Sequence, residues 1–363
     1  FAIMRAVGAR ASLLRRVQRI ELAGVGLLAG FLASIVASAV GWALARYVFE
    51  FDWVVSLWVP LFGALTGAAL ALAAGWWGLR EVLRHPAFAG FAPLLLPWDG
   101  RSYDENLRLS NFGALLPYHS QVNTSVIVDS LNHMIDDVAG GRPVFYDFYT
   151  QAQKQEQAAK AFAGLFFFRG KPGAPFAVIA PGGGFSYVGS VHEGFPYALE
   201  ISNRGYNAFV LKYRAGYGGE VATQDMAAAI SYILRNADAL GVSPRHYSVW
   251  GSSAGARMAA SIGTHGTSGF GRKDASKPAV VVMAYTGHSD YSAEDPPTFV
   301  VVGEHDGIAP PSTMERRVAA LRRAGVEVDY RKYNGLGQGF GSGAGTTAEG
   351  WVSEAVRFWE KFM

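Results

Sequence analysis

A serine within Gly-Ser-Ser-Ala-Gly at 251–255 has the sequence surroundings of a catalytic nucleophile. An apolar run precedes this Gly-x-Ser-x-Gly pattern and small helix-forming residues follow it, so Ser253 is predicted at a sharp turn from a strand into a helix. The two flanking glycines have no side chains that would collide in so tight a turn. The alternative is a turn in which the glycines are only steric and the serine caps the helix.

A glycine run, Pro-Gly-Gly-Gly-Phe at 181–185, follows an earlier predicted strand. The backbone amides of Gly183 and Gly184, together with that of Ala254, are the candidate donors to the oxyanion of a tetrahedral intermediate. A phosphate-binding loop is the competing interpretation, but its Gly-x-Gly-x-x-Gly spacing, the helix directly after it and the acidic residue closing the next strand are missing. A purely structural turn is the third possibility.

An acidic residue is expected after a late strand, where it would orient a histidine base and stabilise its cation. Asp306, in Gly-Glu-His-Asp-Gly at 303–307, is the candidate. Glu304 is the nearest competitor, although strand alternation and the turn at Gly307 favour Asp306. An ordinary aspartate in a surface turn is the alternative to both.

The position expected for the histidine base holds Gln338, within the glycine-rich segment 335–341. A glutamine donates and accepts hydrogen bonds but cannot take up a proton near neutral pH, so the triad is incomplete as written. His288 and His305 are possible substitutes, although a histidine at either place is more often a loop or packing residue.

Aromatic residues beside the glycine run are candidates for binding a sugar ring. Phe185 and Tyr187 are predicted to stack on it, and Ser252 and His288 complete the predicted substrate-binding set. The sequence has no cysteine, and the remaining histidines have no metal-ligand spacing, so neither a metal nor a cofactor is expected.

From residue 164 onward, short apolar runs alternate with helical patterns, which predicts a mostly parallel sheet covered on both faces. Catalytic groups then gather at the carboxyl ends of the strands. Residues 101–163, with a helix at 126–138, are expected to wrap this domain. Strands are predicted at 165–168, 176–180, 208–213, 247–250, 279–284, 298–302 and 328–333, and helices at 197–204, 223–240, 254–263, 312–324 and 348–362.

The first 86 residues differ in charge and hydropathy from the rest. Residues 1–90 carry a net charge of +4, which leaves the remainder at −1. Residues 22–45 and 53–79 contain no charge, and each run exceeds the roughly 20 residues that a membrane-spanning helix needs. Arginines outside the two runs and acidic residues between them predict that both ends lie in the cytoplasm. Because the basic residues flank apolar segments, they favour a membrane partner over nucleic acid. Two buried helices of a soluble core are the alternative.

The domain boundaries follow from these patterns. Residues 1–86 are predicted as a transmembrane hairpin, 87–100 as a proline-rich linker and 101–363 as the α/β domain. Pairs of glycines at Gly26 and Gly30 and at Gly63 and Gly67 are predicted to let the two hairpin helices approach closely.

The sequence also resembles two known protein families. The segments 3–10, 13–16, 41–46 and 78–84 resemble the last two membrane helices of FtsX-like ABC-transporter permeases, although no P-loop is present, so transport by this chain alone is not expected. If residues 1–88 are foreign to the natural protein, a soluble cytoplasmic location is expected instead. The motifs at 164–170, 181–187, 251–257 and around Gln338 resemble α/β-hydrolase fold esterases that include acetylesterases and acetylxylan esterases.

The esterase resemblance implies a carboxylic-ester hydrolase with Ser253 as nucleophile, Asp306 as acid and a histidine base at the position of Gln338. Few residues separate the strands at 279–284 and 298–302, which leaves no room for a large lid. We therefore expect a short acyl group such as acetyl, on an alcohol or a sugar such as xylan. The alternatives are an inactive member that keeps the cleft as a binding module and a permease fragment with a passenger domain.

Overall fold

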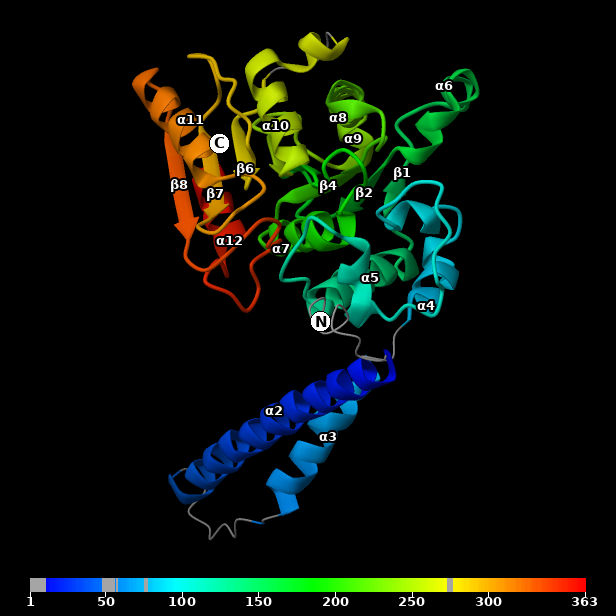
Figure 1. Cartoon of the computed structure of the whole chain (residues 1–363), viewed down its shortest axis with the longest axis vertical. Helices are drawn as coiled ribbons and strands as arrows, with labels where there is room; N and C mark the ends of the chain where they lie inside the picture. Colours follow the sequence, from blue (N-terminus) through cyan, green and yellow to red (C-terminus); the bar gives the residue numbers. More distant parts are fainter. Residues whose placement is uncertain (1–10, 48–55, 57, 75–77, 273–276) are drawn as a thin grey trace. The chain divides into compact units, whose positions relative to one another are not determined.

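The computed structural model describes residues 11–47, 56, 58–74, 78–272 and 277–363 (Figure 1). The chain divides into two compact units, of which the smaller comprises residues 1–81 and 105–110. The larger comprises residues 82–104 and 111–363.

The larger unit is built on one eight-stranded sheet with the strand order β1-β2-β4-β3-β5-β6-β7-β8. Strands β1 and β2 pair antiparallel, β2 pairs antiparallel with β4, and all pairs from β4 to β8 are parallel. This order and the reversed β2 are the topology of the α/β-hydrolase fold, so the predicted mostly parallel sheet is confirmed. The strands are β1 (Phe145–Tyr146), β2 (Gly164–Phe168), β3 (Phe176–Ala180), β4 (Asn207–Lys212), β5 (Ser248–Ser252), β6 (Val280–Ala284), β7 (Thr298–Gly303) and β8 (Val328–Tyr333).

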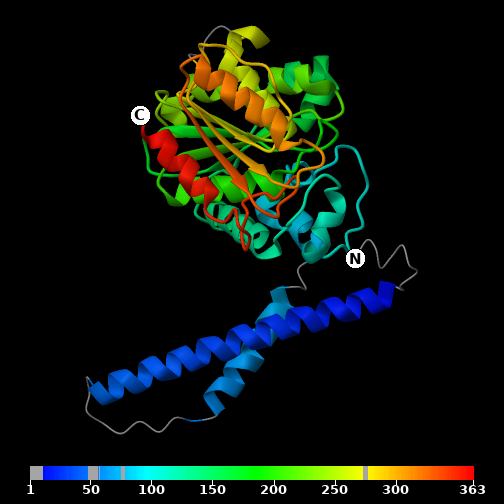
Figure 2. The same cartoon turned by 60° about the vertical axis from the view of Figure 1, so that its left-hand side comes forward.

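Helices cover both faces of this sheet, as its apolar strands require. On one face α8 (Gly218–Arg235) and α10 (Ala254–His265) pack together, and on the other α7 (Phe195–Asn203) packs against α12 (Trp351–Glu360) and α5 (Thr124–Ala139). Figure 2 shows α11 (Pro311–Arg323) and α12 on opposite sides of the strands. Shorter elements of this unit include η1 (Pro86–Phe88), η2 (Ala92–Leu95), the π-helical turn η5 (Ser190–Gly194), α6 (Gln151–Glu156), α9 (Ala237–Leu240) and η6 (Thr267–Phe270).

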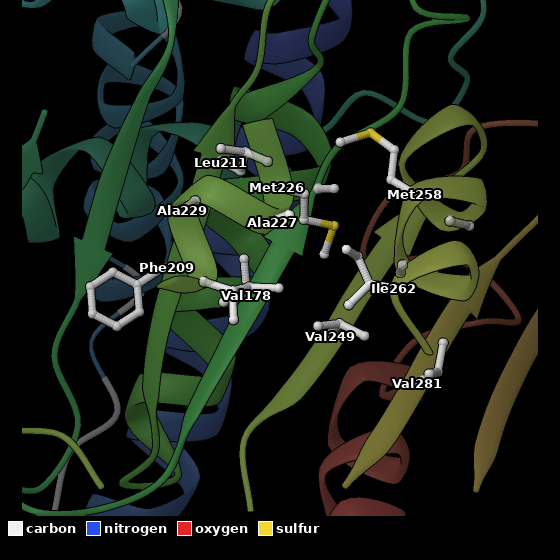
Figure 3. Packing of buried hydrophobic residues seen from close by; sticks show 14 of the residues in the cluster. Val178, Phe209, Leu211, Met226, Ala227, Ala229, Val249, Met258, Ile262 and Val281 are labelled. Carbon is white, nitrogen blue, oxygen red and sulfur yellow. The ribbon is translucent and has the colours of Figure 1, made fainter. Parts of the chain in front are cut away.

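The core lies between the sheet and α8 and α10. Every residue of β3, β4, β5, β6 and β7 is buried. In Figure 3, Val178 and Val249 from the strands face Met226 of α8 and Ile262 of α10. Burying each such side chain contributes about 1.5–3 kcal/mol, so the strand ends that carry the site are held by a rigid support.

Residues 87–100, predicted as a linker, are packed into the larger unit. Phe88 and Leu95 are fully buried. The buried ammonium group of Lys212 donates to the carbonyl oxygens of Leu96 (3.0 Å) and Pro97 (3.1 Å) and pairs with Asp99 at 2.8 Å. The prediction of a linker is wrong because the prolines and glycines prevent a long helix but do not prevent apolar residues from packing.

The smaller unit contains α2 (Ala11–Tyr47) and α3 (Trp58–Ala74), which pack against each other. A Cβ on Gly30 would lie 2.1 Å from the carbonyl oxygen of Gly63, and one on Gly67 would lie 2.2 Å from that of Gly26. The prediction that these glycines permit a close approach is confirmed.

Within the described residues, one helical segment, Ala23–Leu44, is long and apolar enough to cross a membrane. Trp58–Ala69 is apolar but shorter. The second predicted span, 53–79, includes residues outside the described ones. A hairpin of two membrane spans is therefore not established by length and composition.

Candidate active site

Ser253 connects β5 to α10 in a strained backbone conformation. Its φ is 51° and its ψ is −114°, which is a region that side-chain-bearing residues enter at a cost of about 1–3 kcal/mol. A Cβ on Gly251 would lie 2.2 Å from the carbonyl carbon of Gly255, and one on Gly255 would lie 1.8 Å from the carbonyl oxygen of Ala180. The expected steric need for both glycines is confirmed, and the turn presents the Ser253 hydroxyl at the carboxyl end of the sheet.

Gln338 lies between Ser253 and Asp306. Its amide oxygen faces the Ser253 Oγ at 2.7 Å, and its nitrogen lies 3.1 and 2.5 Å from the two carboxylate oxygens of Asp306. The opposite orientation of the amide would place its oxygen against that carboxylate, so the hydrogen bonds determine how the amide is turned. The glutamine thus accepts from the serine and donates to the aspartate, as a neutral histidine would.

Asp306 is buried in the turn after β7. Its Oδ1 accepts the backbone amides of Ile308 at 2.9 Å and Ala309 at 2.8 Å. Burial raises the pKa of Asp306 above its ordinary value, although these two amides oppose the shift. The structure therefore brings the three residues together as the sequence analysis expected, with an amide where a titrating group would be needed.

The glycine run lies beside Ser253. A Cβ on Gly182 would be 3.0 Å from the Cβ of Ser253. Gly183 has a φ of 139° and Gly184 a φ of 62°, conformations that glycine adopts readily. Neither amide has a hydrogen-bond partner in the part of the chain that the structure describes. Ala254 is the first residue of α10, where amides have no acceptor within the helix.

Two of the four predicted substrate-binding residues face away from the site. Ser252 is fully buried, with its Oγ 3.0 Å from the Tyr197 hydroxyl. Tyr187 is also fully buried and contacts His119 through its hydroxyl. Neither side chain can contact a sugar, because strand alternation and packing turn both inward. Phe185 remains half-buried with its ring close to Gly219.

Neither possible substitute histidine is hydrogen-bonded to Ser253 or Asp306 within the described residues. The His305 side chain is 68% exposed and lies 3.8 Å from Glu304. His288 is buried, and burial, followed by Arg317 and Arg257, lowers its pKa to about 4. His288 is therefore a neutral packing residue near neutral pH, and the predicted rescue by either histidine has no contact that supports it.

A buried polar group behind the glycine run escaped the sequence analysis. Glu193, in η5, is fully buried and accepts hydrogen bonds from the Gly182 amide and the Tyr285 hydroxyl. It also lies 3.0 Å from the Nε2 of His119. Burial alone would raise the pKa of Glu193, but His119 and the hydrogen bonds outweigh it, and the pKa lies below its usual value. No local pattern marked these residues, because their partners are distant in the chain.

Comparison with known proteins gives a partial match. Residues 169–285 match the family model BD-FAE. This segment contains the glycine run and Ser253 but neither Asp306 nor Gln338. Over 93 residues the chain is 33% identical to endo-1,4-beta-xylanase B of Butyrivibrio fibrisolvens. The matched region is 24% of this chain and 14% of that protein. The chain thus spans about a seventh of the curated relative that it matches.

Solved structures similar to this chain include hydrolases of low sequence identity. An alpha/beta hydrolase, MGS-M1, from a Medee basin deep-sea metagenome library is 24% identical, with a TM-score of 0.48 over 55% of this chain and 92% of that one. The esterase Est2 of Thermogutta terrifontis is 19% identical, with a TM-score of 0.49 over 55% of this chain and 89% of that one. The acetyl ester-xyloside bifunctional hydrolase of Caldicellulosiruptor lactoaceticus is 22% identical, with a TM-score of 0.48 over 55% and 88%.

Proposed function

We propose that the larger unit carries a serine-type carboxylic-ester hydrolase site with Ser253 as nucleophile. The observation that supports this best is the hydrogen-bonded chain from Ser253, on a strained strand-to-helix turn, through Gln338 to Asp306. The amides of Gly183, Gly184 and Ala254 would hold the oxyanion formed when the Ser253 Oγ attacks an ester carbonyl carbon.

Gln338 determines how fast this chemistry runs. When Oγ attacks, its proton must pass to a base, and the leaving alcohol must receive one. The Gln338 oxygen accepts the hydrogen bond but cannot hold the proton, so in this chain the Ser253 proton would pass to water and the leaving alcohol would take one from water. The chain is therefore expected to bind esters and to turn them over about 10²–10⁴ times more slowly than a form with a histidine there. The acyl group on Ser253 would then be released by water.

The substrate is a short acyl ester, with acetyl as the preferred group and an alcohol or sugar such as xylan as the acceptor. The connection between β6 and β7 is short and bears no inserted domain. The half-buried ring of Phe185, next to the glycine run, is the remaining candidate for contact with a sugar. The matched relative from Butyrivibrio fibrisolvens is a xylanase by name, which agrees with a carbohydrate substrate.

The test is the substitution Gln338→His in the full chain. Hydrolysis of an aryl acetate should rise by about 10²–10⁴-fold, because a titrating group then stands between Ser253 and Asp306. The same variant should form a covalent adduct with a serine-directed phosphonate faster than the parent chain. Ser253→Ala in the Gln338→His background is the control and should abolish both. A Gln338→His protein that folds but gains neither property would contradict the proposal.

A binding module is the second candidate function, and Gln338 itself favours it. Such a module would retain the cleft without turnover. Acetate esters that bind to the parent chain with unchanged affinity after Ser253→Ala, without gain of hydrolysis in Gln338→His, would support it over the esterase.

We also propose that residues 22–45 and 53–79 anchor the chain in a membrane as a hairpin, with the larger unit on the cytoplasmic side. The arginines before the first run and after the second, with Glu50 and Asp52 between the runs, support this orientation. The exposed apolar side chains of Ala23–Leu44 support insertion. Residues 82–363 expressed alone should then be folded and leave the membrane fraction, whereas the full chain should require detergent. A soluble, folded product would show that the hairpin is dispensable for the larger unit, as the permease-fragment alternative also requires.

A further inference from the structure

A single buried carboxylate connects the segments that surround Ser253. One oxygen of Glu193 accepts the Gly182 amide at 2.5 Å. The other accepts the Tyr285 hydroxyl at 2.7 Å and lies 3.0 Å from the Nε2 of His119. Glu193 is fully buried, and so large a desolvation cost is tolerated only where hydrogen bonds satisfy the charge.

Each of these three donors belongs to a different segment of the site. Gly182 begins the glycine run. Tyr285 follows β6, and its hydroxyl accepts the amide of Gly341 at 3.2 Å, close to Gln338 in the chain. The carbonyl oxygen of Tyr285 lies 3.1 Å from the Gln338 amide nitrogen.

His119 belongs to the third segment. The next residue, Ser120, donates its amide to the carbonyl oxygen of Gly339 at 3.0 Å and its hydroxyl to that of Gln338 at 2.8 Å. The segment that carries His119 therefore holds the backbone of the Gln338 loop. Through its three donors, Glu193 is coupled to both sides of the candidate active site.

The donors and acceptors of this network match when Glu193 accepts throughout. The Tyr118 amide donates to the Tyr187 hydroxyl at 3.1 Å, and that hydroxyl lies 2.7 Å from the Nδ1 of His119. When the Tyr187 hydroxyl donates to Nδ1, the Nε2 of His119 carries the proton that points to Glu193. A carboxylate alone offers acceptors to all three donors, whereas a glutamine would turn an N–H group against one of them.

We propose that Glu193 is a positioning residue that fixes the glycine run in the geometry needed to bind an oxyanion, an inference that rests on the proposed esterase function. The Gly182 amide is held by Glu193, whereas the next two amides have no partner among the described residues. Fixing the first peptide plane orients the following two toward the reacting carbonyl group. Preorganised donors of this kind need no rearrangement when charge develops.

The first arm of the test measures loop order and needs no catalysis. Hydrogen–deuterium exchange of the full chain should show that Glu193→Gln speeds exchange of the amides within 181–189 at least tenfold, while the amides of α12 (Trp351–Glu360) exchange as in the parent chain. Glu315→Gln, a surface carboxylate bonded to Lys332, is the matched control and should change neither. Unchanged exchange of 181–189 in a folded Glu193→Gln protein would overturn the proposal.

Tyr285→Phe covers the case in which Glu193→Gln does not fold. This variant keeps the ring and removes one of the three donors to Glu193, so exchange of 181–189 should rise at least threefold with α12 unchanged. If Glu193→Gln does not fold and Tyr285→Phe leaves exchange of 181–189 unchanged, the proposal is also overturned.

The second arm measures catalysis in the Gln338→His background. Adding Glu193→Gln should lower kcat on an aryl acetate at least tenfold with less than a threefold change in KM, because the loss concerns the oxyanion and not substrate binding. An unchanged kcat despite a loosened loop would overturn the proposal. If Gln338→His itself has no activity, the esterase proposal fails and the exchange arm alone decides the role of Glu193.

Discussion

The two sides of Ser253 differ in the kind of group that would take part in the reaction. On one side, the glycine run offers backbone amides and is held from behind by Glu193. On the other, Asp306 and Gln338 keep the hydrogen-bond geometry of a triad, but the residue between serine and aspartate does not titrate. Geometry and proton transfer are therefore separable, since a site can preserve a 2.7 Å contact to its serine without a base.

The two functions are separable because the oxyanion donors belong to the backbone, whereas the base belongs to a side chain. Oxyanion donors are backbone amides, which a side-chain substitution does not remove, so their function depends on how neighbouring residues hold the loop. A base is a single side chain, and one substitution removes it. The base side therefore loses its function when one side chain is replaced, whereas the oxyanion side loses it only when a substitution displaces the loop or its supports.

The largest effect is expected from Asp306→Asn, and it should depend on residue 338. In the Gln338→His background, kcat/KM on an aryl acetate should fall by about 10³–10⁴-fold, because an aspartate is needed to hold the histidine tautomer and its cation. In the parent chain the same change should alter hydrolysis less than about threefold, since no base is present to be oriented. Asp238→Asn on the surface is the control. Equal losses of kcat/KM in both backgrounds would contradict the conclusion that geometry and proton transfer are separable.

Gly183→Ala tests the oxyanion side by displacing its backbone. A Cβ there would lie 2.1 Å from the carbonyl oxygen of Tyr187, at a φ of 139°. We expect kcat in the Gln338→His background to fall about 10²-fold. The free energy of unfolding, measured with urea, should fall by about 2–3 kcal/mol because of overpacking and backbone strain. Gly287→Ala, where the added Cβ meets open space, should be neutral in both measurements.

The free energy of unfolding of the larger unit should fall as the pH falls, because of His192, whose Nε2 lies 2.9 Å from the carbonyl oxygen of Gly339. Burial lowers the pKa of His192 from 6.5 to about 4. Between these values the unfolded chain binds a proton that the folded chain does not, so stability falls as pH falls from 6.5 to 4, by up to about 3 kcal/mol from this residue. His192→Gln should make urea unfolding less dependent on pH across this window. An unchanged slope would show that other groups are responsible.

The smallest effect concerns the far end of the Glu193 network. The Tyr197 hydroxyl lies 3.0 Å from both the Ser252 Oγ and the Tyr285 hydroxyl. Tyr197→Phe should lower the free energy of unfolding by about 1–2 kcal/mol, because it leaves a buried hydroxyl short of one partner. Tyr291→Phe, at a half-exposed tyrosine, is the control. A loss of similar size there would contradict the explanation that burial makes the missing partner costly.

Much of the fold was predictable because its signals are local. The strands 176–180 and 328–333 were predicted with the bounds that the structure has, the first of them from a run of apolar residues. The helix predicted at 223–240 is instead two helices, which meet at Asn236. The strand at 165–168 was predicted but its antiparallel direction was not, since strand direction depends on connections rather than on composition. The two-residue strand β1 was not predicted.

The candidate site was predictable only in part, for the same reason. Ser253, Asp306 and the position of Gln338 follow strand ends within short motifs. Tyr187 and Ser252 were misplaced because the side that faces the cleft is decided by packing. Glu193 gave no local signal, because Tyr285 lies 92 residues away from it in the chain.

The sequence alone determined the alternation of strands and helices, the tight glycine turn at Ser253 and the glutamine at the base position, since these depend on neighbouring residues or on a single residue's identity. Only the tertiary structure decided which side chains reach the site, how the Gln338 amide is turned and what holds the glycine run. These properties arise when segments distant in the chain meet in a buried interior, where every donor and acceptor must find its partner.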